Sequence, residues 1–183
     1  MQVKKHALAG LLEFTPRLFG DPRGLFYETF SARLMHEAGI RADVEWVQDN
    51  QSKSQRGVLR GLHFQRPPHA QAKLVRVAQG RVLDVVVDLR RASPTYGQHQ
   101  QVELTAALGN VLYVPAGFAH GFVALDDETL FLYKCSAYYA PAAEGGLRWN
   151  DPALGIDWGV HAPLVSGKDE ELPGFAGFES PFA

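Results

Sequence analysis

The sequence predicts an all-β protein, either a double-sheet jelly roll or a small barrel, with one or two short helices. Three observations predict this class. Many short segments alternate apolar with polar residues and are rich in β-branched side chains. The turn-forming residues, 18 Gly and 11 Pro, are spread along the whole chain and separate these segments. Only one stretch has clear helical spacing, whereas a parallel α/β sheet needs a helix between most strands.

The clearest strand covers residues 81–89. Its two faces consist of Leu83, Val85, Val87 and Leu89 on one side and Val82, Asp84, Val86 and Asp88 on the other. We expect residues 71–78 to form a hairpin with it through a tight turn at Gln79 and Gly80. Further strands are expected near residues 5–19, 24–30, 43–48, 57–65, 98–105, 110–114, 119–125 and 128–139.

The single helix is expected over residues 31–38. Ser31 can cap its N-terminus, Leu34 and Met35 have helical spacing, and Gly39 can end it. From Asn150 onward, Gly, Pro and Asp residues predict irregular coil packed on the barrel, and residues 170–183 form an irregular tail. At 183 residues, we expect one domain spanning residues 1–183.

Composition excludes several function classes. Hydrophobic residues make up 46% and charged residues 21%, as in an ordinary globular protein. The 18 basic and 20 acidic residues give a net charge of −2, without the basic excess of a nucleic-acid binder. No apolar run approaches the roughly 20 residues of a membrane span, the N-terminus lacks a secretory signal, and the single Cys135 cannot form an intramolecular disulfide. We therefore expect a cytoplasmic protein with neither nucleic-acid nor membrane partners.

Residues 50–77 place several polar side chains in two strands that we expect to be neighbours. His63 and Lys73 can both face the lumen of a barrel. Arg60 lies three residues before His63, so strict alternation would put the two on opposite faces, but a bulge at Gly61 would turn both inward. Any one of these side chains alone is more often structural or solvated than functional.

Several such residues considered together favour a functional role over a structural one. Arg60, His63, Lys73, His120 and Tyr133 all lie in or beside apolar strands. Burying so many polar groups is costly unless they face a polar cavity, and a hollow barrel provides one. The pattern therefore favours a binding or catalytic cavity over five independent structural roles.

The segment 114–122 contains Pro115, Gly117 and His120 in a PxGxxH spacing that resembles the second motif of the cupin jelly rolls. In metal-binding cupins this His is a ligand, and the first motif supplies an HxH pair followed by a Glu. Here the corresponding stretch begins at His63, and the next His is only His69. The residues that remain make a three-His or two-His-one-carboxylate site hard to assemble, so we expect no metal.

Residues 131–139 contain three tyrosines. If the strand continues through this segment, Tyr133 and Tyr139 share one face and Tyr138 shares the other with Lys134. A tyrosine in a cavity can donate a proton or stack on a ring, although a core tyrosine with a satisfied hydroxyl is the commoner case.

Taken together, the chain closely resembles the dTDP-4-dehydrorhamnose 3,5-epimerase family. The motifs that carry the resemblance are FGDPRGLFYETF (19–30), VQDNQSKS (47–54), GVLRGLHFQRPPHAQAKLVRV (57–77), GRVLDVVVDLRRASPTYG (80–97), VPAGFAHGF (114–122), LYKCSAYYAPAAEGGLRWNDPALGIDW (132–158) and SGKD (166–169). They run through nearly the whole chain as far as Asp169. The resemblance implies a cupin jelly roll, a homodimer, and catalysis without metal or nicotinamide cofactors.

The resemblance also implies a reaction. The substrate would be dTDP-4-dehydro-6-deoxy-D-glucose, inverted at C3 and C5 to dTDP-4-dehydro-L-rhamnose in dTDP-rhamnose biosynthesis. His63 would be the base and Asp169 its orienting carboxylate. Tyr133 would be the acid on the opposite face of the ring. Lys73 would stabilise the negative charge that develops on O4.

Substrate-binding residues follow from the same resemblance. Arg23 and Arg60 would clamp the diphosphate. Tyr139, or its neighbour Tyr138, would stack on the thymine. The other implied binding residues are Phe26, Glu28, Gln48, Asn50, Lys73, His120, Glu144 and Lys168. The N-terminal segment with Arg23 would reach the partner subunit's site by exchange of edge strands.

Three alternatives remain open from the sequence. The first is an epimerase that inverts only C3 or only C5 of a related dTDP-4-keto-6-deoxysugar, with the same residues. The second is a non-catalytic cupin that binds sugar nucleotides. The third is a metal-dependent cupin oxygenase or isomerase.

Overall fold

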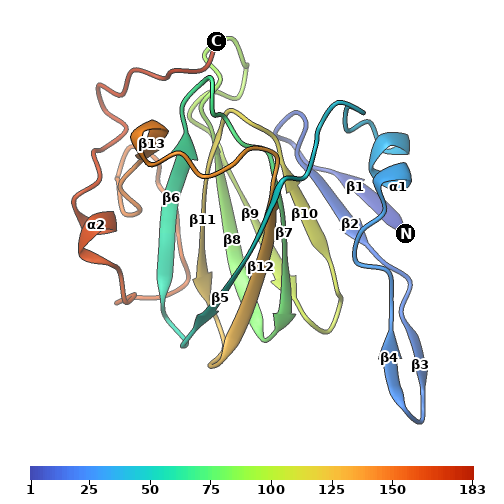
Figure 1. Ribbon diagram of the computed structural model, residues 1–183. Helices are drawn as coiled ribbons and strands as arrows, with labels where there is room; N and C mark the ends of the chain where they lie inside the picture. Colours follow the sequence, from blue (N-terminus) through green and yellow to red (C-terminus); the bar gives the residue numbers. More distant parts are fainter.

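Two antiparallel sheets face each other in the computed structural model, which describes all residues 1–183 (Figure 1). The six-stranded sheet has the spatial order β1 (Gln2–Lys5), β2 (Leu12–Thr15), β10 (Val111–Val114), β7 (Lys73–Gln79), β12 (Thr129–Cys135) and β5 (Gln48–Ser54). The five-stranded sheet has the order β13 (Glu144–Gly146), β6 (Leu59–Gln65), β11 (Phe118–Ala124), β8 (Arg81–Asp88) and β9 (His99–Thr105). The predicted all-β jelly roll is confirmed.

Apolar side chains fill three layers. Val75 and Val82 belong to the cluster between the sheets. Val85 and Val87 face the other way and are covered by the C-terminal segment that contains Phe182. The outer face of the six-stranded sheet packs on α1 (Ala32–Glu37) through Met35. The predicted strand over residues 81–89 is confirmed, and the structure shows that its two faces belong to an inner and an outer core.

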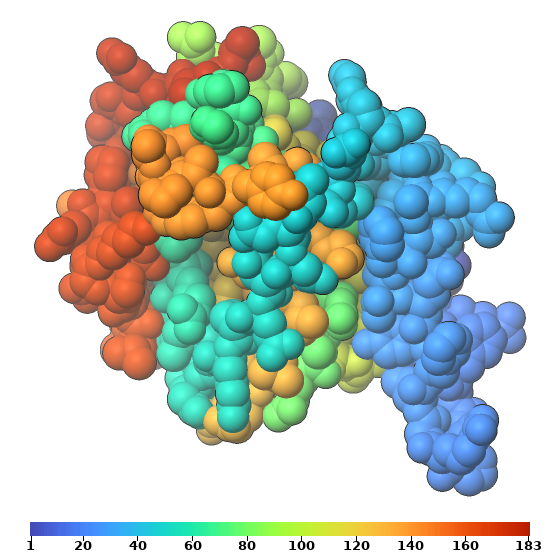
Figure 2. Space-filling model, in the orientation of Figure 1, coloured from blue at the N-terminus to red at the C-terminus, as the bar shows by residue number.

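A two-stranded hairpin, β3 (Phe19–Asp21) and β4 (Gly24–Phe26), projects away from the two sheets, in blue in Figures 1 and 2. All six residues of its strands are exposed. A short 3-10 helix, η1 (Pro141–Ala143), leads into β13.

Most predicted strands are confirmed to within two residues at each end. They are the strands expected at 57–65, 71–78, 81–89, 98–105, 110–114 and 119–125. The segment 5–19 is instead divided into β1 and β2 with part of β3, and the strand expected at 24–30 ends at Phe26. The strand expected at 128–139 ends at Cys135, so Tyr138 and Tyr139 lie beyond it.

The strand expected at 43–48 is wrong, because the strand in this region is β5, which begins at Gln48 and ends at Ser54. In β5, Gln48, Asn50 and Ser52 are partly buried and alternate with exposed residues. Both faces of the strand are polar, so no apolar periodicity marks it in the sequence.

The hairpin predicted across Gln79 and Gly80 is also wrong. β7 pairs with β10 and β12, whereas β8 pairs with β9 and β11. The chain therefore crosses from one sheet to the other at Gly80. Gly80 has φ +78°, and a Cβ there would lie 2.6 Å from the Thr129 hydroxyl oxygen, so a glycine is needed at this corner. A tight turn gives no information about whether its flanking strands pair.

The predicted helix is confirmed as α1, with Ser31 at the N-cap position and Gly39 at φ +103° beyond its end. The Ser31 hydroxyl makes no capping hydrogen bond. A second helix, α2 (Gly167–Glu170), interrupts the irregular region expected after Asn150. Neither helix is long or apolar enough to cross a lipid bilayer.

Candidate active site

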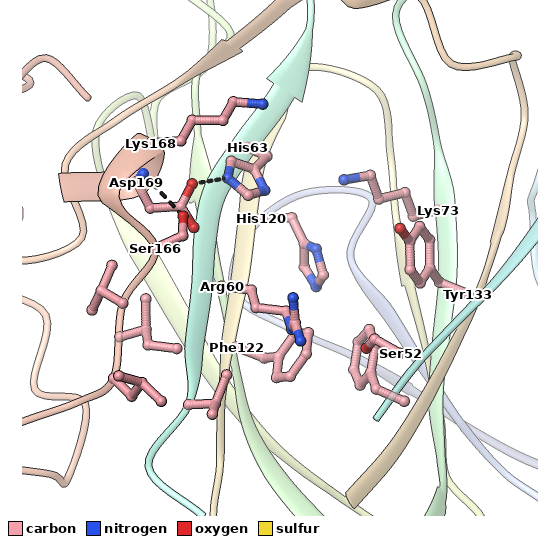
Figure 3. Close-up of a pocket in the computed structure, with 15 residues that line it drawn as sticks. Ser52, Arg60, His63, Lys73, His120, Phe122, Tyr133, Ser166, Lys168 and Asp169 are labelled. Carbon is pink, nitrogen blue, oxygen red and sulfur yellow. Dashed lines mark hydrogen bonds and ion pairs between the residues drawn. The ribbon is translucent and has the colours of Figure 1, made fainter. Parts of the chain in front are cut away.

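A cavity of about 530 Å³ opens between the two sheets (Figure 3). Both sheets and α2 contribute polar side chains to it. They are Arg60 and His63 from β6, His120 from β11, Ser52 from β5, Lys73 from β7, Tyr133 from β12, and Ser166, Lys168 and Asp169 at α2. Phe122 and Phe131 form part of its apolar wall.

The sequence left open whether a bulge at Gly61 turns Arg60 inward, and the structure contains that bulge. His63 pairs with His120 and Arg60 pairs with Phe122, so β6 has one more residue than β11 between these two pairs. Gly61 has φ +138°, and a Cβ there would lie 2.5 Å from the Cα of Gly121. Only glycine fits this close approach, and the extra residue turns both Arg60 and His63 toward the cavity.

The expectation that Lys73 lies on a strand next to His63 is wrong. β6 belongs to the five-stranded sheet and β7 to the six-stranded sheet. Lys73 and Tyr133 therefore face His63 across the cavity, as Figure 3 shows. The error follows from the connection between the two strands, which joins the sheets instead of closing a hairpin.

His63 forms a close pair with a buried carboxylate. Its Nε2 lies 2.7 Å from Oδ1 of Asp169, and the Gly61 backbone N–H donates to Oδ2 at 3.3 Å. Burial raises the pKa of Asp169, but the hydrogen bonds from His63 and Gly61 outweigh it and leave the pKa below its usual value. A carboxylate only accepts hydrogen bonds, so Nε2 carries the proton and Nδ1 is left for a ligand.

Asp169 owes its position to α2. The Ser166 hydroxyl accepts a hydrogen bond from the Asp169 backbone N–H at 3.2 Å and caps this short helix. The Asp169 side chain is only 5% exposed, whereas that of His63 is 31% exposed. The carboxylate is thus fixed behind an imidazole that solvent or substrate can reach.

Two cations face the cavity without a carboxylate partner. Lys73 makes no hydrogen bond or ion pair, and the single side-chain hydrogen bond of Arg60 goes to the Ser54 hydroxyl at 3.2 Å. Burial lowers the pKa of Lys73, and electrostatic interactions with Cys135, Asp84 and Glu144 oppose that change. Unpaired positive charge in a partly enclosed site is suited to a ligand that carries or develops negative charge.

Tyr133 lies on the wall opposite His63 (Figure 3). Burial is the main reason that the pKa of its phenol is raised, and the positive charge of Arg60 opposes this. The hydroxyl is therefore protonated at neutral pH and can donate.

A smaller adjoining pocket shares His63, Lys73 and Tyr133 with the main cavity. Its other polar residues include four of the predicted binding residues, Gln48, Asn50, Tyr139 and Glu144. The Tyr139 hydroxyl and the Lys168 ammonium both donate to Oε2 of Glu144 at 2.7 Å, and the Tyr139 N–H donates to Gln48 at 2.8 Å. Burial raises the pKa of Glu144, but these two side-chain hydrogen bonds outweigh it and lower the pKa.

Three predicted binding residues lie away from the cavity of their own chain. Arg23 is on the projecting hairpin, where its side chain is 90% exposed and pairs with Asp21 at 2.5 Å. Phe26 is 72% exposed, and with Glu28 it borders a different surface pocket next to Met1 and Pro16.

Sequence reasoning missed two polar residues here. Ser52 lines the cavity, and its position could have been found from its alternation with Gln48 and Asn50. Asp84 lies directly behind His120, with 2.8 Å between Oδ2 and the His120 Nε2. The signal for Asp84 is a charged residue between Val82 and Val86 on the inner face of a strand. No group of three or more His, Cys, Asp or Glu side chains is arranged to hold a metal ion.

Comparison with known proteins identifies the family. The family model described as dTDP-4-dehydrorhamnose 3,5-epimerase matches residues 5–177. The dTDP-4-dehydrorhamnose 3,5-epimerase of Salmonella typhimurium is 49% identical over 174 residues, which cover 94% of each chain.

Two further relatives bear on the chemistry. The crystal structure of a Legionella pneumophila 3,5-epimerase in complex with dTDP-4-keto-L-rhamnose is 40% identical, covers 97% of this chain and 94% of that one, and has a TM-score of 0.92. A dTDP-4-dehydrorhamnose 3-epimerase from Streptomyces niveus is 40% identical, over 93% of this chain and 82% of its own length. The protein is therefore an isomerase, and it belongs to the dTDP-4-dehydrorhamnose 3,5-epimerase family.

Proposed function

We propose that this enzyme inverts C3 and C5 of dTDP-4-dehydro-6-deoxy-D-glucose to give dTDP-4-dehydro-L-rhamnose, by proton transfer between its own side chains and the sugar. The step belongs to dTDP-rhamnose biosynthesis in the cytoplasm. One observation carries this proposal: His63 and Tyr133 lie on opposite walls of one cavity, with the unpaired Lys73 beside the tyrosine. A base and an acid on opposite faces of a ring are what inversion requires.

The first step removes a proton. A hydrogen on a carbon next to the C4 ketone is acidic once the enolate is stabilised. Nδ1 of His63 takes that proton, and the electrons of the C–H bond move to form an enolate with its charge on O4. Asp169 stabilises the imidazolium that results. Lys73 places positive charge at O4, where a fixed donor in a dry site contributes about 3 kcal/mol.

The second step returns a proton to the opposite face. The Tyr133 hydroxyl donates to the carbon, the electrons on O4 re-form the ketone, and the configuration is inverted. His63 is then an imidazolium and Tyr133 a phenolate. Exchange of protons with water restores both groups, and the same sequence at the second carbon completes the reaction.

Binding of the nucleotide involves the adjoining groups. Arg60 is free of any carboxylate and can hold the diphosphate in bidentate geometry. Tyr139 lines the smaller pocket and is 53% exposed but held by Glu144 and Gln48, so it can stack on thymine. The Legionella relative was crystallised with a dTDP-4-keto sugar, which supports a substrate of this class.

The projecting hairpin supports a functional homodimer. Arg23, Phe26 and Glu28 are remote from the cavity of their own chain, and the two strands are exposed throughout. We propose that the hairpin extends to the partner subunit, where these residues complete its binding site by exchange of edge strands.

Solvent exchange tests the reaction. The enzyme is incubated in D2O with dTDP-4-dehydro-6-deoxy-D-glucose, and deuterium at each carbon is followed by NMR. We expect label at both C3 and C5 and formation of the L-rhamno product. Binding without any exchange would identify a non-catalytic nucleotide-binding protein.

Single-carbon epimerisation is a second candidate, favoured by the Streptomyces niveus 3-epimerase at 40% identity. That reaction uses the same base, acid and cation, because each inversion requires only that one carbon lie between the base and the acid. Label confined to C3 would establish it in place of the double inversion.

A further inference from the structure

Only two buried side-chain atoms in the chain lack a hydrogen-bond partner, Ser52 Oγ and Asp84 Oδ1. Both belong to residues at or directly behind the proposed active site. The unpaired Asp84 oxygen is the energetically more costly of the two, because a buried carboxylate is unfavourable unless its charge is compensated. It is fully buried on β8, between Val82 and Val86 of the inner core, and does not itself line the cavity.

The only hydrogen-bond partner of the Asp84 side chain is His120, at 2.8 Å from Nε2 to Oδ2. The His120 side chain is 7% exposed and lines the cavity between Lys73 and Arg60 (Figure 3). The Phe131 ring stacks on it, with 6.1 Å between ring centroids. Since a carboxylate only accepts, Nε2 holds its proton toward Asp84, and Nδ1 is the nitrogen left for a ligand.

A buried carboxylate with one oxygen unpaired is costly unless a neighbouring group compensates it, and His120 is the side chain that contacts Asp84. An imidazolium has a second N–H, at Nδ1. Together with Arg60 on the adjacent strand, it would offer donors to a ligand with several anionic oxygens. A diphosphate is such a ligand, whereas the sugar ring is neutral.

We infer that Asp84 is a positioning residue that acts through His120, holding the imidazolium so that its Nδ1–H binds an anionic oxygen of the substrate's diphosphate. This rests on the proposed function, since it takes a nucleoside diphosphate sugar as the substrate. Asp84, although it lies outside the cavity, then contributes to nucleotide affinity and takes no part in the proton transfers.

The test compares Asp84→Asn with Asp88→Asn, the same change on the same strand. Asp88 binds Arg90, Ser93 and Thr95 and lies outside the cavity. Asparagine can still accept the His120 hydrogen bond but carries no charge. We expect Asp84→Asn to weaken dTDP binding, measured by calorimetry, about tenfold, with kcat changed by less than about threefold. Asp88→Asn should bind dTDP as the unmodified enzyme does.

A double-mutant cycle shows whether the effect passes through His120. In a His120→Gln background, Asp84→Asn should weaken dTDP binding by less than about twofold further. Additive losses, or an Asp84→Asn variant with unchanged affinity for dTDP, would overturn the inference. If the unmodified enzyme itself does not bind dTDP, the proposed function fails instead.

If the Asp84→Asn variant does not fold, NMR of the unmodified enzyme tests the same inference. With ¹⁵N-labelled histidine, the resonances that His120→Gln removes belong to His120. Nε2 should be protonated with and without dTDP, and the Nδ1 resonance should move when dTDP binds. An unprotonated Nε2, or no response at Nδ1, would contradict the inference.

Discussion

Two His–Asp pairs, His63 with Asp169 and His120 with Asp84, lie side by side at the cavity and differ in solvent access. His63 and His120 are register partners on β6 and β11. In the first pair the imidazole is 31% exposed and its Asp169 5% exposed; in the second, His120 is 7% and Asp84 0% exposed. The ring-to-carboxylate distances, 2.7 and 2.8 Å, are nearly the same.

The difference teaches that burial, more than the pairing itself, separates the two proposed roles. A base must reach a carbon-bound proton and exchange it with water afterwards, so its ring has to be accessible. A residue that only binds an ionic ligand benefits from burial, because its electrostatic interaction with the ligand is stronger in a low dielectric. The open pair therefore suits proton transfer, and the closed pair suits binding.

The largest effect is expected from His63→Ala. Removing the proposed base should lower kcat by about 10⁴-fold, at the upper end of what general acid–base catalysis contributes. Turnover by NMR and dTDP affinity by calorimetry would be measured on the same sample. Unchanged affinity with lost turnover supports the separation of roles, and substantial remaining deuterium exchange would show that another group is the base.

Tyr133→Phe should lower product formation by about 10³-fold. The proposed acid is lost while the base remains, so deuterium should still enter the substrate by exchange on the His63 side. NMR compares the rate of solvent exchange with the rate of inversion. If both fall equally, Tyr133 is not the donor to the opposite face.

Asp169→Asn should lower kcat by about 100-fold, because Asp169 acts only through His63. The affinity for dTDP should stay the same, the reverse of what we expect for Asp84→Asn. Steady-state kinetics and calorimetry on both variants sharpen the comparison between the two pairs. Equal losses in dTDP affinity for both variants would show that the pairs do not have separate roles.

The smallest effect on catalysis is expected from Asp88→Asn, which removes a third buried carboxylate. Burial raises the pKa of Asp88, but hydrogen bonds from Arg90, Ser93 and Thr95 outweigh it and lower the pKa to about 2. A lowered pKa stabilises the fold above the unfolded-state value of about 3.9, and that stability is lost as the pH falls toward 2.

The expected size of this stabilisation is about 2 kcal/mol at neutral pH. The free energy of unfolding, from urea denaturation, should therefore differ between Asp88→Asn and the unmodified protein at pH 7, with the difference shrinking toward pH 2. Asp21→Asn on the exposed hairpin is the control and should show little difference. If the difference in the free energy of unfolding persisted at pH 2, the charge of Asp88 would not be its cause.

Much of the fold and site could be predicted because the relevant patterns are local. Alternation in β8 separated its residues into two faces, and Gly61 between Arg60 and His63 marked the position where a bulge could turn both inward. β5 escaped prediction because both its faces are polar, and the β7–β8 hairpin was wrong because a tight turn fits both a hairpin and a crossing between sheets.

The sequence by itself determined which chemical groups the protein has and which strand faces carry them, since alternation along a strand depends only on neighbouring residues. Only the tertiary structure decided which groups meet. Lys73 and Tyr133 face His63 because their strands belong to the opposite sheet, and Asp169 and Asp84 reach their imidazoles from α2 and β8. Such contacts depend on strand order and on the packing of distant segments. Both are set by burial of the whole core, so no local sequence pattern predicts them.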